Sequence, residues 1–365
     1  MRWLSGVFSV VMFTVVFSPS LHSFPPAEAI RSSHLHLYQH PPGRHDSGSP
    51  RSGRFLFRRS PAFRNSDKCS RRFKPGRAPV CDPSLVHIAI TLDVAYLRGS
   101  IAAVNSILQH AECPESVFFH FLVEPAGTGL ASLVRATFPG LNFKVYPFEP
   151  EKVRSLISTS VRAALEQPLN YARNYLADLI EPCVSRVIYL DSDLVLVDDI
   201  SALWTTDLGS RTIGAPEYCH ANFEKYFTAS FWSSTNCTNV FQNRQPCYFN
   251  TGVMVIDLAR WRENGYTREI ERWMEIQKSA RIYDLGSLPP FLLVFAGIVA
   301  PIEHRWNQHG LGGDNVNGSC RDLHPGKVSL LHWSGSGKPW LRLDSKRPCP
   351  MDAHWLRYDL YGFSN

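Results

Sequence analysis

The amino-acid sequence predicts an α/β fold with a mostly parallel central sheet flanked by helices. Two observations predict it: short apolar strand patterns alternate with helical patterns, and one apolar strand ends in two carboxylates. The hydrophobic content, 44% of the 365 residues, is ordinary for a globular protein. Such alternation is typical of a parallel sheet, because neighbouring parallel strands need a long crossover that is usually helical. The length allows one large domain or two smaller ones.

The first half of the chain has the clearest periodicity. Apolar strand patterns cover residues 86–92, 117–123 and 141–146, and helical patterns cover residues 97–110 and 130–138. In a doubly wound sheet of this kind, the carboxyl end of the first strand is where a nucleotide is expected to bind. No glycine-rich dinucleotide fingerprint follows that strand and the chain has no P-loop, so a dinucleotide-dependent enzyme or an ATPase is disfavoured.

The second half is less regular. Its predicted elements are a mostly helical stretch over residues 151–180 that is interrupted near Pro168, strands from Arg186, at Ile213 and over residues 249–258, and an amphipathic helix over residues 260–278. The interval 218–248 is long, polar and aromatic, which suits a functional loop or small insert near a site. Cys219, Cys237 and Cys247 could staple this interval.

The N-terminus predicts entry into the secretory pathway. Arg2 precedes an uncharged apolar run from Trp3 to Phe17, which is signal-peptide-like and short for a bilayer span of about 20 residues. A small-x-small cleavage site lies further on, so residues 1–29 are predicted to be a cleaved signal peptide or a short type II anchor. Either option places the bulk of the protein in the lumen.

The cysteine content agrees with a lumenal protein. Nine cysteines fit an oxidising compartment, and their odd number leaves at least one thiol unpaired or joined to a partner. No Cys-x-x-Cys pair has zinc spacing, so a structural zinc site is disfavoured, and the spacing leaves the pairing open. Asn236 and Asn317 begin glycosylation triplets, which agree with the same address.

Residues 30–80 are predicted to form a basic, flexible stem before a catalytic domain over residues 81–365. This stretch holds twelve Lys or Arg against two acidic residues and is rich in Pro, Ser and Gly. A basic run can bind nucleic acid, but a lumenal address disfavours that partner. Loose attraction to acidic polysaccharide and a merely solvated linker are the two alternatives.

Two carboxylates, Asp191 and Asp193, lie at the end of the nearly continuous apolar strand that begins at Arg186. Ligands of open α/β sheets collect at the carboxyl ends of such buried strands. Two aspartates at i and i+2 can both reach one divalent cation, and Mg²⁺ and Mn²⁺ prefer carboxylate oxygens and are commonly shared with phosphates. The alternative is a solvated turn, since Asp is common in turns.

A second polar stretch lies near the C-terminus and contains His332, Gly335 and Lys338. Glycine lets backbone amides approach phosphate oxygens, lysine supplies positive charge, and histidine can ligate a divalent metal. A Trp-anchored surface turn is the alternative. Together with Asp191 and Asp193, the stretch predicts a metal–diphosphate site, which needs carboxylates for the metal and a cation for the phosphates.

The sequence resembles glycosyltransferase family 8, and within it the plant galacturonosyltransferase-like branch. The stretches that carry the resemblance are residues 91–96, 170–173, 189–193, 249–254, 285–290, 305–312 and 332–340. The resemblance spans about residues 85–345. It implies a single nucleotide-sugar-binding domain of the glycosyltransferase A type, and sugar transfer with retention of configuration, usually with Mn²⁺.

The resemblance also implies roles for individual residues. The metal, Mn²⁺ or Mg²⁺, would be held by Asp191, Asp193 and His332. The residues implied to bind the UDP-sugar are Thr91, Leu92, Asp93, Tyr96, Arg173, Ser192, Gly335 and Lys338, with Tyr96 beside the uracil and Lys338 and Gly335 at the diphosphate. The residues implied at the reacting sugar are Asn250, Arg173 and Asp284. A metal plus a lysine can stabilise the departing UDP, where negative charge builds.

One departure from the family bears on the donor. Many members carry an Asp-Gln-Asp-type triplet where this chain has Asp284 followed by Leu-Gly-Ser-Leu-Pro-Pro, as the galacturonosyltransferase branches do. This favours a uronic acid over a conventional hexose. Since no carboxylate nucleophile is evident, we expect same-face attack in which the donor phosphate helps to take the acceptor proton.

The resemblance therefore predicts a Golgi transferase of the hexosyltransferase type. It would move galacturonic acid from UDP-galacturonic acid to a plant cell-wall polysaccharide, pectin or xylan, alone or with other transferases, and it would bind no nucleic acid. One alternative keeps the fold and uses UDP-galactose, UDP-glucose or UDP-xylose. The other is a non-catalytic partner that binds polysaccharide or anchors another transferase.

Overall fold

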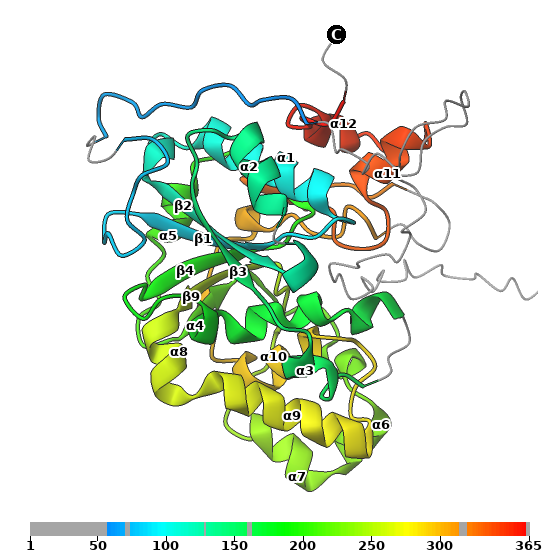
Figure 1. The fold of residues 1–365 in the computed structure, drawn as a ribbon. Coiled ribbons are helices and arrows are strands. Elements are labelled where there is room, and N and C mark those ends of the chain that lie inside the picture. The colour runs from blue at the N-terminus through cyan, green and yellow to red at the C-terminus, as the bar shows by residue number, and fades with distance from the viewer. Residues whose placement is uncertain (1–56, 70–73, 128, 159–162, 314–319, 363–365) are drawn as a thin grey trace, which may run out of the picture.

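A computed structural model describes residues 57–69, 74–127, 129–158, 163–313 and 320–362 (Figure 1). The predicted signal or anchor segment and the stem up to residue 56 lie outside the described residues. Within the described ranges, no helix combines the length and the apolar character that crossing a bilayer requires.

The core of the fold is a seven-stranded sheet of order β10-β6-β9-β4-β1-β2-β3. Its strands are β1 (Val86–Thr91), β2 (Val117–Val123), β3 (Asn142–Pro147), β4 (Arg186–Leu190), β6 (Ile213–Ala215), β9 (Val253–Asp257) and β10 (Ala300–Pro301). Strands β4, β1, β2 and β3 pair in parallel, as β10 and β6 do, whereas β9 runs antiparallel to both of its neighbours. The predicted mostly parallel sheet is confirmed, with one reversed strand inside it.

Both faces of the sheet are buried beneath helices, which explains why its strands are apolar at successive positions. Alternate residues of β1 belong to different cores, since Ile88 and Ile90 pack with α1 (Leu97–His110) and α2 (Leu130–Thr137), whereas Ala89 lies in the other core. Figure 1 shows α1 and α2 on one side of the sheet and α8 (Leu258–Asn264), α9 (Tyr266–Ala280) and α10 (Leu288–Phe295) on the other.

Apart from α9, which has 15 residues, the remaining helices are short. They are α3 (Glu151–Arg154), α4 (Leu176–Leu179), α5 (Ile200–Trp204), α6 (Ala229–Ser233), α7 (Thr235–Thr238), α8 (Leu258–Asn264), α9 (Tyr266–Ala280), α10 (Leu288–Phe295), α11 (Pro339–Asp344) and α12 (Asp352–Leu356). The prediction of a single helix over residues 260–278 is wrong, because the structure has two helices there. Gly265, with φ of 65°, ends α8 in the left-handed conformation, so α9 begins as a separate helix.

Two further predicted elements are divided in the structure. The helical stretch over residues 151–180 consists of α3, two 3₁₀ segments that include Pro168–Tyr175, and α4. The strand predicted over residues 249–258 is split by a turn into β8 (Tyr248–Phe249) and β9, and β8 pairs with β7 (Glu217–Tyr218) instead of joining the large sheet. That turn carries Asn250.

A two-stranded antiparallel sheet brings two distant parts of the chain together. It consists of β5 (Leu194–Leu196) and β11 (Leu330–His332), with His332 opposite Leu194. The backbone N–H of Trp333 also donates to the carbonyl of Asp193 at 2.8 Å. This pairing fixes the C-terminal stretch against the end of the strand that carries the aspartates.

Four disulfides are present in the described chain. They join Cys69 to Cys113, Cys81 to Cys183, Cys219 to Cys247 and Cys320 to Cys349. Cys237 is a buried free thiol, so the predicted unpaired cysteine is found, and two of the three cysteines expected to staple residues 218–248 do so.

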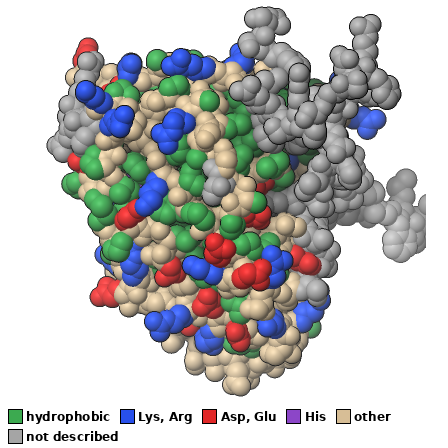
Figure 2. Space-filling view, viewed as in Figure 1, with side chains coloured by type: hydrophobic (Ala, Val, Ile, Leu, Met, Phe, Trp, Pro, Cys, Tyr) green, Lys and Arg blue, Asp and Glu red, His purple; other side chains and the backbone are tan. Residues whose placement is uncertain are grey.

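Contacts with the domain begin before the predicted boundary at residue 81. The backbone N–H groups of Arg58 and Ser60 donate to the carbonyls of Leu360 and Thr137, and Cys69 is tied by its disulfide. On the face in Figure 2, acidic and basic side chains are interspersed over the lower half, in keeping with the 25 basic and 29 acidic residues of positions 81–365.

Candidate metal and donor site

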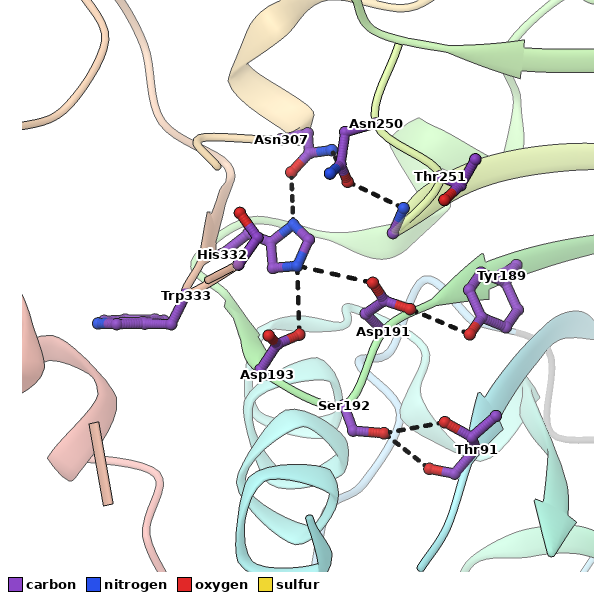
Figure 3. A network of polar contacts seen from close by, with 12 residues as sticks. Thr91, Tyr189, Asp191, Ser192, Asp193, Asn250, Thr251, Asn307, His332 and Trp333 are labelled. Carbon is purple, nitrogen blue, oxygen red and sulfur yellow. Dashed lines mark hydrogen bonds and ion pairs between the residues drawn. The ribbon is translucent and has the colours of Figure 1, made fainter. Parts of the chain in front are cut away.

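Three potential metal ligands converge at the carboxyl end of β4. One ligand atom each of Asp191, Asp193 and His332 lies within 4.8 Å of the other two, and all three residues are buried (Figure 3). The aspartates follow β4 and His332 ends β11, so the sheet pairing described above assembles the cluster. Two carboxylate oxygens and an imidazole nitrogen suit a divalent cation such as Mn²⁺, Mg²⁺ or Zn²⁺.

Asp193 lies between His332 and Lys338. Its Oδ1 is 3.2 Å from Nε2 of His332, and its Oδ2 accepts a hydrogen bond from the ammonium of Lys338 at 2.5 Å. Burial acts to raise the pKa of Asp193, but the positive charge of Lys338 and the polar contacts with His332 and Lys338 outweigh burial and hold that pKa well below its usual range. Burial lowers the pKa of Lys338, against the opposing pull of Asp193 and Asp191. Asp193 is therefore an anion ready to receive a cation.

Asp191 is oriented from the opposite side. Its Oδ1 accepts from the Tyr189 hydroxyl at 3.0 Å and lies 3.4 Å from the Arg173 guanidinium, while its Oδ2 faces His332 Nε2 at 3.8 Å. Arg173 is itself fixed by donating to the carbonyl of Thr251 at 3.0 Å and to its hydroxyl at 2.8 Å. One oxygen of Asp191 is thus held by the protein and the other points into the cluster.

A glycine makes room for these ligands. A Cβ on Gly252 would lie 2.4 Å from Cε1 of His332 and 2.6 Å from Oδ2 of Asp191. The backbone of Gly252 also holds the turn, because its carbonyl accepts from the Asp191 N–H at 2.8 Å and its N–H donates to Asn250 Oδ1 at 2.9 Å. Only glycine fits this close approach.

The residues predicted to frame the nucleotide lie around the start of α1. The Ser192 hydroxyl donates to the carbonyl of Thr91 at 2.7 Å, which ties the segment that carries Asp191 and Asp193 to the end of β1. Asp93 accepts the Tyr96 N–H at 3.0 Å just before α1. Leu92 is buried, and its N–H donates to the carbonyl of Leu122.

Tyr96 connects this wall to the C-terminal stretch. Its ring meets that of Trp340 edge to face at 5.6 Å, and the Lys338 ammonium lies 5.4 Å from its centre. The stretch is clamped by glycines, since Gly335 has φ of 114° and a Cβ there would lie 2.3 Å from the carbonyl oxygen of Gly312. The lysine and the aromatic ring thus face the cluster from one rigid wall.

Asp284 has no part in the contacts described above. It is exposed and pairs with Arg281 at 2.9 Å, three residues earlier. The catalytic role that the family resemblance implied for Asp284 stays a prediction, as do the roles of Asn250 and Arg173. Asn250 does lie beside the cluster, through its contact with Gly252.

Besides Gly252, three polar residues of the site had no role in the sequence-based prediction. Tyr189 and Thr251 hold Asp191 and Arg173, and Asn307 contacts His332 at 2.9 Å. They lie inside stretches that resemble the family, but nothing in their spacing reveals these contacts. Asn307 and His332 are 25 residues apart and meet only when β11 is in place.

Comparisons with known proteins agree with the geometry. A family model described as "Glycosyl transferase family 8" matches residues 87–344. "Probable galacturonosyltransferase-like 7" of Arabidopsis thaliana is 70% identical over 365 residues, covering 99% of both chains. "Probable galacturonosyltransferase-like 6" of the same plant is 66% identical over the full length of both chains.

Solved structures share the fold. The chain superposes on the galactosyltransferase LgtC, in complex with donor and acceptor sugar analogues, with a TM-score of 0.59 and 22% identity over 77% of this chain and 98% of LgtC. It also resembles the glycosyltransferase GlyE of Streptococcus pneumoniae, with a TM-score of 0.52 and 17% identity over 76% of this chain and 61% of GlyE. At these identities the likeness shows the fold alone.

Proposed function

The chain belongs to glycosyltransferase family 8 and is a glycosyltransferase, and we propose that its donor is UDP-galacturonic acid. It transfers galacturonic acid to a plant cell-wall polysaccharide, pectin or xylan, with Mn²⁺ bound at the cluster. The observation that carries the proposal is the set of Asp191, Asp193 and His332 with Lys338 bonded to Asp193. A scaffold protein has no need of a buried metal–diphosphate set.

The donor is the finer part of the proposal. Relatives at 66–70% identity are named as probable galacturonosyltransferase-like proteins. The segment after Asp284 lacks the Asp-Gln-Asp-type triplet that many family members carry. Both observations favour a uronic acid over galactose, glucose or xylose.

The chain's own residues account for binding and orientation. A divalent metal held by Asp191, Asp193 and His332 would act as a Lewis acid that stabilises charge on the leaving diphosphate. Lys338 would exchange its bond with Asp193 for the diphosphate, and Tyr96 would cover the uracil. Arg173, which Thr251 holds in place, contacts Asp191 directly and keeps it aimed at the cluster.

We propose same-face transfer. The bond between the sugar's anomeric carbon and the β-phosphate oxygen breaks, and the acceptor hydroxyl oxygen bonds to the same face of that carbon. The acceptor proton passes to the phosphate oxygen, so UDP leaves with the electron pair. Trapping a covalent glycosyl-enzyme on a side chain would contradict this route.

We also propose that the protein works in the Golgi lumen, as a type II membrane protein or after cleavage of a signal peptide. The apolar run from Trp3 to Phe17 supports entry into the secretory pathway. The four disulfides support an oxidising compartment. Mass-spectrometric identification of the mature N-terminus distinguishes the anchor from the cleaved signal.

The experiment that tests the function is a panel of UDP-sugars scored for UDP release and for transfer to pectin and xylan oligosaccharides. UDP-galacturonic acid with Mn²⁺ is expected to give the highest rate, and chelation of the metal is expected to abolish it. Preference for another UDP-sugar would overturn the donor, and failure with every donor would favour a non-catalytic partner. Asp193→Asn is expected to lose transfer, and Asp207→Asn, in an exposed turn where Asp207 accepts the Gly209 N–H, is its matched control.

A further inference from the structure

Asn307 is a fully buried amide that joins the cluster to the turn before β9. Its Oδ1 lies 2.9 Å from Nδ1 of His332, and its Nδ2 donates to Oδ1 of Asn250 at 3.1 Å. Figure 3 shows Asn307 above the His332 ring, on the side opposite Asp193. The amide therefore has one end on a proposed metal ligand and the other at the proposed reaction face.

The orientation of this amide follows from a backbone group. The Gly252 N–H can only donate, and it donates to Asn250 Oδ1 at 2.9 Å. The Asn307 atom next to that oxygen must then be the donor Nδ2, so Oδ1 of Asn307 faces His332. Amide orientations have to be assigned from the hydrogen-bond network in this way.

The orientation determines the tautomer of His332. An amide oxygen can only accept, so the proton of the imidazole lies on Nδ1. In the neutral ring, which is the form that ligates a metal, Nε2 then carries the lone pair, and it lies 3.2 Å from Oδ1 of Asp193 and 3.8 Å from Oδ2 of Asp191. Three acceptors directed at one point form a site for a cation.

We infer that Asn307 is a positioning residue that holds His332 in its metal-binding tautomer and couples this ligand to Asn250. The inference rests on the metal site of the proposed function. Without Asn307, the His332 proton is better placed on Nε2, where it donates to Asp193 and competes with the metal. Partners that fix a ligating histidine in this way are typically worth 10–100-fold in metal affinity.

The backbone around Asn307 is held in register with the ligand. The Gln308 N–H donates to the carbonyl of Leu330, and the His332 N–H donates to the carbonyl of Gln308. The Tyr218 hydroxyl donates to the Asn307 carbonyl at 2.6 Å. The amide is therefore rigid enough to select one tautomer.

The test is calorimetric titration of the full chain with Mn²⁺, for the wild type and for two substitutions at Asn307. Asn307→Leu keeps the shape but removes the acceptor, and about 10–100-fold weaker Mn²⁺ binding is expected. Asn307→Asp keeps an acceptor on His332 but replaces the donor to Asn250. Mn²⁺ affinity at or above that of the wild type, with a lower rate of sugar transfer, is expected.

The control is Asn142→Leu, which removes a buried amide that bonds Glu115 and Ala78 at the start of β3. It should leave Mn²⁺ affinity unchanged, and urea unfolding of all variants shows which are folded. Unchanged Mn²⁺ binding in Asn307→Leu would overturn the inference alone, as would equal losses in the Leu and Asp variants. A wild type that binds no Mn²⁺ would overturn both the inference and the metal site itself.

Discussion

Nε2 of His332 lies 3.2 Å from Oδ1 of Asp193, although the two residues are 139 positions apart in the sequence. The contact exists because β11 pairs with β5, which places His332 opposite Leu194. Neither strand belongs to the large sheet. The small sheet therefore assembles the metal cluster, and the large sheet supplies only the end of β4.

Lys338 stabilises the domain through Asp193. Lys338→Met keeps the length of the side chain but leaves a buried carboxylate without its cation, and removing one partner of such a pair costs about 3–5 kcal/mol. We expect the free energy of unfolding in urea to fall by that amount. The double variant Asp193→Asn with Lys338→Met should be more stable than Lys338→Met alone, and a double variant that is less stable would contradict the pairing.

Gly252→Ala should displace a metal ligand while the domain stays folded. The added methyl would lie 2.4 Å from Cε1 of His332, so the ligand must move. We expect Mn²⁺-dependent sugar transfer to fall by about 100-fold or more, because small displacements of catalytic groups are that costly. Gly129→Ala is the matched control, since nothing lies within 4 Å of its Cβ, and equal activity of the two variants would contradict the close fit.

Stability should decrease in acid because of a buried histidine pair. His87 donates into a chain that runs through His120 and Tyr146 to Glu181, with contacts of 2.9, 2.9 and 2.6 Å. Burial lowers the pKa of His87 to about 4 and that of His120 to about 3. Both rings therefore fold in the neutral form.

The sign of the effect follows from these depressed values. In the unfolded chain the pKa of His87 is 6.5, so the unfolded chain takes up a proton at a higher pH than the folded protein does. The free energy of unfolding therefore has its full value above pH 6.5 and decreases as the pH falls toward 4. For His87 the loss is about 3 kcal/mol at 1.36 kcal/mol per unit. In urea unfolding between pH 7.5 and 4, His87→Gln should show a slope smaller by about 1.4 kcal/mol per pH unit below pH 6.5. An unchanged slope would contradict this origin.

The disulfide between Cys219 and Cys247 should support the site as well as the fold. It flanks Tyr218, which holds the Asn307 carbonyl, and Tyr248, which lies 3.5 Å from Asn250 Nδ2. Replacing both cysteines by Ser should cost about 3–4 kcal/mol of stability for a loop of this length and weaken Mn²⁺ binding. Cys237→Ala removes a buried free thiol and serves as the control. Unchanged Mn²⁺ affinity in the double variant would show that the disulfide acts on stability alone.

Much of the frame could be predicted because its physical causes are local. The apolar runs of β1 and β2 and the periodic face of α1 are visible in the sequence, and α1 and β2 have the predicted bounds. The break at Gly265 was missed because a single glycine is tolerated within a helix, although glycine is also typical of a helix end. The reversal of β9 was missed because a buried strand has the same composition in either direction.

The site could be predicted only as far as residue chemistry reveals it. Asp191, Asp193, His332 and Lys338 are chemically distinctive, and the structure brings all four together. Asn307 is an ordinary amide in the sequence. Its orientation is set by Asn250, whose Oδ1 accepts from the Gly252 N–H, and residue spacing does not reveal this chain of contacts. Asp284, by contrast, looks reactive in the sequence but is exposed and paired with Arg281.

Calorimetric titration of UDP into the protein with and without Mn²⁺, for the wild type and Asp193→Ala, tests the central claim most directly. The wild type should bind UDP tightly only when Mn²⁺ is present. Asp193→Ala should lose about 100-fold or more of that affinity, because a metal ion contributes several kcal/mol at such a site. Binding of UDP that is equally tight without metal, or unaffected by Asp193→Ala, would contradict the assignment of this cluster as the metal–diphosphate site.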